Sequence, residues 1–162
     1  MALLDLFGGG KPAVDVGQSA PDFELTDAQG KRVRLADFRG KRAVVLYFYP
    51  KDDTPGCTKE ACSFRDSYES FKEAGAEVIG VSSDSEASHG KFASKYKLPF
   101  TLLADKSGAV RKQYGVPATL GLLPGRVTFV IDREGIVRHV FNSQLQATRH
   151  VDEALSVLQR LK

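Results

Sequence analysis

The sequence predicts one α/β domain built on a mixed central β-sheet with helices on both faces. Strand-like apolar runs alternate with helix-like amphipathic segments, and the last third of the chain adds a hairpin instead of another crossover. The 162 residues, 42% of them hydrophobic, are enough for one sizeable core and too few for two ordinary domains. We expect a flexible, glycine-containing lead over residues 1–16 and a single domain over residues 17–162.

The domain is predicted to open with an N-terminal hairpin, which the central strand follows. On either side of a turn at residues 27–30, apolar and polar residues alternate, as they do in half-buried strands. The apolar members are Phe23, Leu25, Val33 and Leu35. Residues 43–49 then form a continuous β-branched and aromatic run, which is typical of a strand buried on both faces.

A helix is predicted to start soon after that strand, at Thr54 and Pro55. Threonine is a favoured N-cap, and proline at the first helical position loses no hydrogen bond. Apolar residues then recur at spacings of three and four until Gly75, where we expect the helix to end. They are Cys57, Ala61, Phe64, Tyr68 and Phe71. Cys57 therefore lies in the first turn of the helix.

The remaining elements complete the order of a thioredoxin-like fold. They are a strand over 77–82, a helix over 85–96, a strand over 100–103, a short helix over 108–114, a hairpin of 127–131 with 136–141, and a final helix. The final helix is expected to bury Val151, Leu155, Leu158 and Leu161. Sites in such sheets form where strands end and helices begin, and the connection from Tyr49 to Cys57 is such a place.

Charge and composition exclude several classes of protein. The formal net charge is only +3, and basic and acidic residues alternate, so we expect no role at nucleic acids or anionic membranes. The longest apolar run, residues 43–49, is far shorter than the roughly 20 residues of a membrane span, and residues 1–7 lack the basic start of a signal peptide. Two cysteines are too few for a disulfide-dense scaffold or for two pairs of zinc ligands.

The predicted surroundings of Cys57 suit a reactive thiolate. Free N–H groups at a helix N-terminus stabilise negative charge. Gly56 leaves the backbone beside the sulfur open to a small substrate, and the Thr54 hydroxyl can cap the helix or donate to the thiolate. The rings of Pro50 and Pro55 are expected to shield the pocket from water. The alternative is that Cys57 is an inert core residue, as a cysteine on an apolar helix face usually is.

The sequence around Cys57 resembles that of a known family. Residues 50–57, Pro-Lys-Asp-Asp-Thr-Pro-Gly-Cys, resemble the peroxiredoxin signature of proline, three residues, threonine, two residues and cysteine. The spacing from Cys57 to Cys62 resembles that of the peroxiredoxin Q, or bacterioferritin-comigratory, branch. The likeness runs from about Gly17 to the C-terminus and includes residues 20–23, 64–66 and 124–126.

The resemblance implies a thiol peroxidase that needs no metal, flavin or nucleotide cofactor. Cys57 is implied to attack H2O2 or an alkyl hydroperoxide and to become a sulfenic acid, which Cys62 resolves as a disulfide within one chain. The implied substrate pocket consists of Pro50, Thr54, Gly56 and Arg126. Thioredoxin is the implied reductant, with glutaredoxin or a thioredoxin-like lumenal donor as alternatives, and members with this cysteine spacing are usually monomeric.

The spacing of the two cysteines poses a geometric problem. Residues five apart on a helix lie roughly 140° apart around its axis, with Cα atoms about 8 to 9 Å from each other. A disulfide rarely tolerates more than about 7 Å. We therefore expect the first helical turns to unwind in each catalytic cycle, and Gly56 lowers the cost of unwinding. The alternative is that Cys62 is inert and that a thiol of another molecule resolves Cys57.

Other titratable residues are assigned smaller roles. Asp52, Asp53 and Glu60 are not required as acid or base groups by thiolate chemistry, and Glu60 is expected to orient Arg126 instead. The three histidines are scattered along the sequence, and two of them are expected at the surface. The surface pair is His89 and His150, and the third is His139.

Two other functions fit parts of the sequence. A general thiol–disulfide oxidoreductase usually needs a C-x-x-C pair, which the chain lacks. A peroxide-sensing or chaperone-like switch protein would oxidise Cys57 once, without efficient turnover. Residues 122–126 and 141–146 resemble the plastid members of the family, which predicts the chloroplast stroma or thylakoid lumen, with the bacterial cytoplasm as the alternative.

Overall fold

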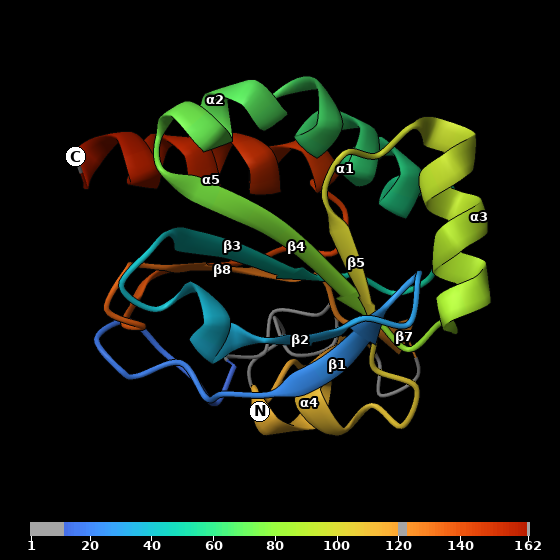
Figure 1. The fold of residues 1–162 in the computed structure, drawn as a ribbon, viewed down its shortest axis with the longest axis horizontal. Helices are drawn as coiled ribbons and strands as arrows, with labels where there is room; N and C mark the ends of the chain where they lie inside the picture. Colours follow the sequence, from blue (N-terminus) through green and yellow to red (C-terminus); the bar gives the residue numbers. More distant parts are fainter. Residues whose placement is uncertain (1–11, 120–122, 162) are drawn as a thin grey trace.

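The computed structural model describes residues 12–119 and 123–161, and within them seven strands form one mixed sheet (Figure 1). The sheet order is β2-β1-β5-β4-β3-β8-β9, in which β3, β4 and β5 run parallel and the other neighbours antiparallel. The strands are β1 (Glu24–Asp27), β2 (Arg32–Arg34), β3 (Ala43–Phe48), β4 (Ala76–Ser82), β5 (Thr101–Ala104), β8 (Val127–Ile131) and β9 (Val137–Asn142). Both predicted hairpins, β1–β2 and β8–β9, are confirmed.

Helices cover both faces of this sheet, as the sequence predicted. They are α1 (Pro55–Asp66), α2 (Tyr68–Glu73), α3 (Glu86–Tyr96), α4 (Ala109–Gln113), α5 (Ala147–Arg160) and the short 3₁₀ helix η2 (Leu35–Phe38). α1, α2, α3 and α5 pack on one face, whereas α4 lies on the other (Figure 1). The interior strand β3 serves both cores, because Val45 and Tyr47 face the first set of helices while Leu46 and Phe48 face α4.

The structure departs from the predicted elements in three places. The single helix expected over residues 54–75 is divided at Ser67, where the backbone leaves helical geometry and α2 begins in a new direction. A small hairpin of β6 (Ala118–Thr119) and β7 (Leu123–Pro124) was not predicted. Leu161 lies beyond the end of α5 and is 46% exposed, so its predicted burial is wrong.

The predicted flexible lead lies outside the described residues for positions 1–11. Val14, which was assigned to the same lead, is 7% exposed and packs in the core beside α4. The packed part of the chain therefore begins before Gly17. Among the helices of the described ranges, none is long and apolar enough to cross a membrane.

Candidate active site

The predicted nucleophile Cys57 lies where the chain leaves β3 and enters α1. It occupies the first turn of α1 and is 1% exposed. Its Sγ accepts a hydrogen bond of 3.4 Å from Nη2 of Arg126, which directly precedes β8. The structure therefore brings together the two residues that the resemblance paired.

Arg126 is held in place by two further contacts. Its Nη1 donates to Oε1 of Glu60 at 2.7 Å, and its Nε donates to the Gln144 carbonyl at 3.1 Å. Arg126 is 4% exposed and Glu60 is fully buried. Burial alone would lower the pKa of Arg126, but the adjacent Glu60 and Cys57 hold it above its ordinary value. The prediction that Glu60 orients Arg126 agrees with this geometry.

Gly56 has a packing role that the sequence did not reveal. A Cβ at this position would lie 2.9 Å from Nη2 of Arg126, which is closer than real Cβ atoms approach other atoms. The glycine therefore leaves room for the guanidinium as it reaches Cys57. Part of the space beside Gly56 that was predicted to be open to a small substrate is occupied by the Arg126 guanidinium.

Thr54 is the N-cap residue of α1, but its side chain does not cap the helix. Its Oγ1 donates to the Lys51 carbonyl at 2.9 Å, so the predicted capping bond is wrong. This bond uses the hydroxyl proton and leaves oxygen lone pairs for a donor such as a peroxide. Pro50 is half-buried, whereas Pro55 is exposed, so the predicted shielding of the pocket by the Pro55 ring is not supported.

Cys62 is half-buried on the same continuous helix α1, and both cysteines are free thiols. Because the backbone between the two cysteines is helical throughout, their Cα atoms are too far apart for a disulfide unless the helix opens locally. One turn further, Nη1 of Arg65 donates to the Tyr96 carbonyl at 2.7 Å and so ties the end of α1 to the end of α3.

Arg111 is a component of the site that sequence reasoning missed. From α4 its Nη2 donates to the Tyr49 carbonyl at 2.7 Å and its Nη1 to the Gly125 carbonyl at 2.8 Å. It thereby joins the segment that leads to Cys57 to the segment that carries Arg126. Burial lowers the pKa of Arg111 to about 10, and the charges of Asp105 and Cys57 partly offset this effect.

His89 and Asp52 form a buried pair under the loop that precedes Cys57, so the predicted surface position of His89 is wrong. His89 Nδ1 lies 2.8 Å from Asp52 Oδ2, and its Nε2 lies 2.9 Å from the Leu103 carbonyl. Tyr49 donates to Asp52 Oδ1 at 2.6 Å. Asp84 adds a third candidate metal ligand beside Asp52 and His89, but the ligand atoms of Asp52 and His89 are already used in these hydrogen bonds.

His150 is also buried, on α5, contrary to prediction. Its Nε2 lies 2.7 Å from the Ser143 carbonyl and its Nδ1 lies 2.8 Å from Thr128 Oγ1. Burial lowers its pKa to about 4, so the ring is neutral at pH 7. Nδ1 also lies 3.6 Å from Oε2 of Glu60, which places His150 behind the Arg126–Glu60 pair.

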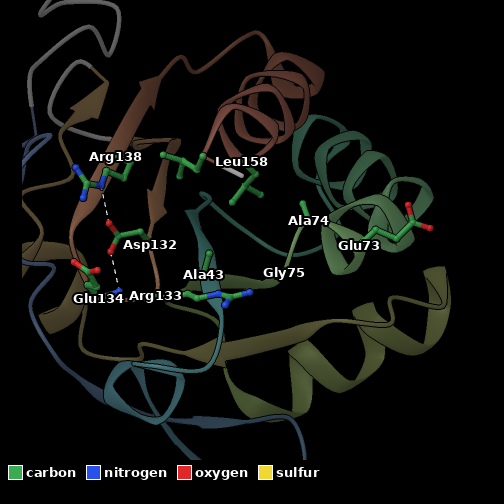
Figure 2. A pocket seen from close by; sticks show the side chains of 10 residues that line it. Ala43, Glu73, Ala74, Gly75, Asp132, Arg133, Glu134, Arg138 and Leu158 are labelled. Atoms are coloured by element: carbon green, nitrogen blue, oxygen red, sulfur yellow. Dashed lines mark hydrogen bonds and ion pairs between the residues drawn. The ribbon is translucent and has the colours of Figure 1, made fainter.

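A hollow of about 500 Å³ lies at the opposite end of β3 (Figure 2). Ala43, the first residue of β3, lines it together with the segment before β4 and the turn between β8 and β9. Asp132 and Arg138 pair across one of its walls at 2.6 Å. The hollow is separate from the Cys57 site, which lies beyond the other end of β3.

Comparison with known proteins agrees with this geometry. Residues 16–140 match the AhpC/TSA family. The chain is 58% identical to chloroplastic peroxiredoxin Q of Sedum lineare over 150 residues, which cover 92% of this chain and 80% of that protein. It is 60% identical to chloroplastic peroxiredoxin Q of Arabidopsis thaliana over 146 residues, 90% of this chain and 67% of that protein.

Solved structures show the same fold. Peroxidoxin BcpB of Mycobacterium tuberculosis superposes with a TM-score of 0.85 at 40% identity, covering 92% of this chain and 99% of that one. The bacterioferritin comigratory protein of Xanthomonas campestris superposes with a TM-score of 0.80 at 30% identity, covering 93% and 99%.

The chain therefore belongs to the AhpC/TSA family of thioredoxin-like peroxidases. Within that family it belongs to the peroxiredoxin Q branch, as the spacing of Cys57 and Cys62 predicted. The curated relatives named above are chloroplast proteins, which also confirms the predicted likeness to plastid members.

Proposed function

We propose that this chain is a thiol-dependent peroxidase that reduces H2O2 and alkyl hydroperoxides with Cys57. The observation that carries the proposal is the contact of Cys57 Sγ with the Arg126 guanidinium at the start of α1. A helix N-terminus and a guanidinium both stabilise a thiolate. The Xanthomonas campestris relative was described in connection with its alkyl peroxide reduction activity, which supports the same substrate class here.

In the proposed reaction, the Cys57 thiolate attacks the distal oxygen of the peroxide. The O–O bond breaks, Cys57 becomes a sulfenic acid, and water or an alcohol leaves. Arg126 and the N–H groups of the first turn of α1 stabilise the charge that develops on both oxygens, and Thr54 Oγ1 accepts a hydrogen bond from the peroxide. Pro50 and Gly56 border the space that the peroxide enters.

Cys62 is proposed to condense with the sulfenic acid and to close an intramolecular disulfide. The half-buried position of Cys62 leaves it accessible after a local opening of α1. A thioredoxin-type dithiol would then reopen the disulfide and restore both thiols.

Mass spectrometry after one equivalent of peroxide tests this sequence of steps. The wild type should contain a Cys57–Cys62 disulfide within one chain, and Cys62→Ser should stop at the sulfenic acid. With thioredoxin present, Cys57→Ser should show no turnover. Retained turnover in Cys57→Ser would refute the proposal, and one stoichiometric oxidation without turnover in wild type would favour the sensor function.

We further propose that the protein works in the chloroplast as a monomer. The chloroplast location rests on the relatives named above. The monomer rests on the surface of the described residues, on which Val16, Leu145 and Leu161 are the exposed large hydrophobic residues, so little apolar side-chain area is available for a stable partner. Light scattering of reduced and oxidised protein should give the mass of one chain, and a doubled mass in both states would contradict it.

A further inference from the structure

Glu60 is a fully buried carboxyl group beside the nucleophile, and only one of its two oxygens is hydrogen-bonded. Oε1 accepts from Arg126 at 2.7 Å, whereas Oε2 has no hydrogen-bond partner among the described residues. A buried ionised carboxylate normally satisfies both oxygens, because an unpaired charge is costly in a low-dielectric interior. A protonated Oε2 would remove that charge.

The cations near Glu60 are too few to neutralise both Glu60 and Cys57. Among the described residues, Arg126 and His150 lie within ion-pair distance of Glu60, at 2.7 and 3.6 Å. His150 adds no positive charge at pH 7, because burial lowers its pKa to about 4. Its two ring nitrogens already face the Ser143 carbonyl and the Thr128 hydroxyl. The guanidinium of Arg126 therefore faces two acids, the Glu60 carboxyl and the Cys57 thiol, with a single positive charge.

The other groups around this cluster decide which acid is ionised. Arg111 donates to two main-chain carbonyls and acts on Cys57 only through its field, which favours the thiolate. Burial, together with Glu60 and Cys57, raises the pKa of Tyr47, so its hydroxyl stays neutral. Burial likewise raises the pKa of Glu60 to about 8, although Arg126 opposes the shift. The favoured arrangement is therefore a Cys57 thiolate beside a protonated Glu60 carboxyl group.

We propose that Cys57 and Glu60 share one proton, which stays on Glu60 while Cys57 is a thiolate and is given up when the sulfur is oxidised and the departing oxygen takes up a proton. The inference rests on the proposed peroxidase function and adds the source of the proton. Cys57 thiolate, Glu60 carboxylic acid and ROOH give Cys57 sulfenic acid, Glu60 carboxylate and ROH. An S–O bond forms and the O–O bond breaks, sulfur loses two electrons, and the distal oxygen keeps its own proton. Re-reduction by a dithiol returns a proton to the pair.

Infrared difference spectroscopy of the wild-type protein at pH 7 tests the shared proton directly. The reduced protein should show the C=O band of one protonated carboxyl group, and this band should disappear after peroxide oxidation. In reduced Cys57→Ser the band should be lost at a lower pH than in the wild type, because Arg126 then serves Glu60 alone and favours its ionised form. A band that disappears at the same pH in both proteins would show that Cys57 has no influence on the Glu60 proton, and that result would overturn the proposal.

Two glutamate variants assign the band and measure its effect on rate. Glu60→Gln should remove the band, whereas Glu69→Gln, at an exposed position of α2, should leave it unchanged. Loss of the internal acid in Glu60→Gln should slow sulfenic acid formation by about 100-fold at pH 7, the lower end of general acid effects. Thiolate absorbance should titrate in one step in Glu60→Gln and in two coupled steps in wild type.

The outcomes also separate this inference from the proposed function. Peroxide consumption without a carboxyl band in the reduced wild type would refute the shared proton and leave the peroxidase intact. A band that responds to a general thiol oxidant, in a protein that does not consume peroxide, would refute the peroxidase instead. The wild-type and Cys57→Ser arms need no substitution at Glu60, so the test holds even if Glu60→Gln fails to fold.

Discussion

Adding a single methyl group at Gly56 tests whether the position of the Arg126 guanidinium matters for catalysis. A Cβ there would lie 2.9 Å from Nη2 of Arg126, a guanidinium already held by Glu60 and the Gln144 carbonyl. Gly56→Ala should therefore push the guanidinium away from the sulfur and lower kcat/KM for peroxide by about 10- to 100-fold. Alanine should at the same time stabilise the helix by up to about 1 kcal/mol. Steady-state rates and urea unfolding measure the two effects separately.

Gly90 in α3 provides the matched control for this substitution. A Cβ at Gly90 would meet only the Ala28 Cβ, at 3.9 Å, which is an ordinary contact. Gly90→Ala should give a similar gain in stability with unchanged kcat/KM. Equal losses of activity in both variants would show that the glycines matter for the helices in general and that Gly56 has no special relation to Arg126.

The residues that sequence could predict at this site are those whose environment is local. Cys57 and Thr54 follow from the helix start after a buried strand, and Arg126 followed from the family motif. Arg111 could not be predicted, because its partners are main-chain carbonyls 62 and 14 residues away. His150 resembled a surface residue because it follows Arg149 and lies two positions before Asp152, and only the packing of α5 shows its burial.

At the scale of the element, helix α1 must open to join its cysteines. We expect residues 57–62 to lose amide protection on oxidation while residues 63–66 keep it. Phe64 is fully buried, and Arg65 is tied to the Tyr96 carbonyl at 2.7 Å, so the last turn stays anchored. Hydrogen exchange of reduced and peroxide-treated protein measures this difference.

Cys62→Ser is the control for this opening, because it cannot form the disulfide. Its protection after peroxide treatment should remain that of the reduced protein throughout α1. Identical protection in reduced and oxidised wild type would contradict local unwinding, and loss of protection over the whole of α1 would contradict the anchor at Arg65.

The buried pair of Asp52 and His89 joins the loop before α1 to α3 and β5. Asp52→Ala would remove the acceptor that the buried Tyr49 hydroxyl and His89 ring share, so we expect it to lower the free energy of unfolding by about 3 kcal/mol. Denaturant unfolding of Asp52→Ala, His89→Leu and the double variant measures the coupling between the two side chains. Additive single effects would mean that the pair is not a unit.

An exposed ion pair of the same loop serves as the comparison. Lys95 pairs with Asp53 at 2.9 Å, and the two side chains are 57% and 45% exposed. Lys95→Ala should cost about 1 kcal/mol or less, because water screens this pair. A cost similar to that of Asp52→Ala would contradict the distinction between the buried and the exposed pair.

Helices and strands were predictable from the sequence where the spacing of apolar residues alone determines them. The continuous apolar run of β3 and the alternating hairpin arms identified their strands correctly. The division of the predicted helix at Ser67 left no trace, because the apolar spacing of three and four continues from Phe64 through Tyr68 to Phe71. The change of direction between α1 and α2 depends on how both pack on the sheet, which local spacing does not record.

At the scale of the whole molecule, two buried groups make the stability of the fold depend on pH in opposite directions. Burial lowers the pKa of His150 to about 4, so the stability that its neutral ring contributes is present above its ordinary pKa near 6.5 and is lost as pH falls toward 4. Burial raises the pKa of Glu60 to about 8. The stability that its protonated carboxyl contributes is therefore fully present below the ordinary glutamate pKa near 4.5 and is lost as pH rises through 8.

Between pH 6.5 and 4.5 these two effects should largely cancel in the wild type, and single substitutions should separate them. His150→Gln keeps a donor for the Ser143 carbonyl and removes the histidine titration, so this variant should gain roughly 2 kcal/mol as pH falls from 6.5 to 4.5. Glu60→Gln leaves the His150 titration alone and should lose roughly 2 kcal/mol over the same range. Urea unfolding at the two pH values measures both slopes. The slope here is the change in the free energy of unfolding with pH. Slopes of opposite sign in the two variants are expected, because the pKa of Glu60 is raised and that of His150 is lowered. Slopes of the same sign would contradict this pair of shifts.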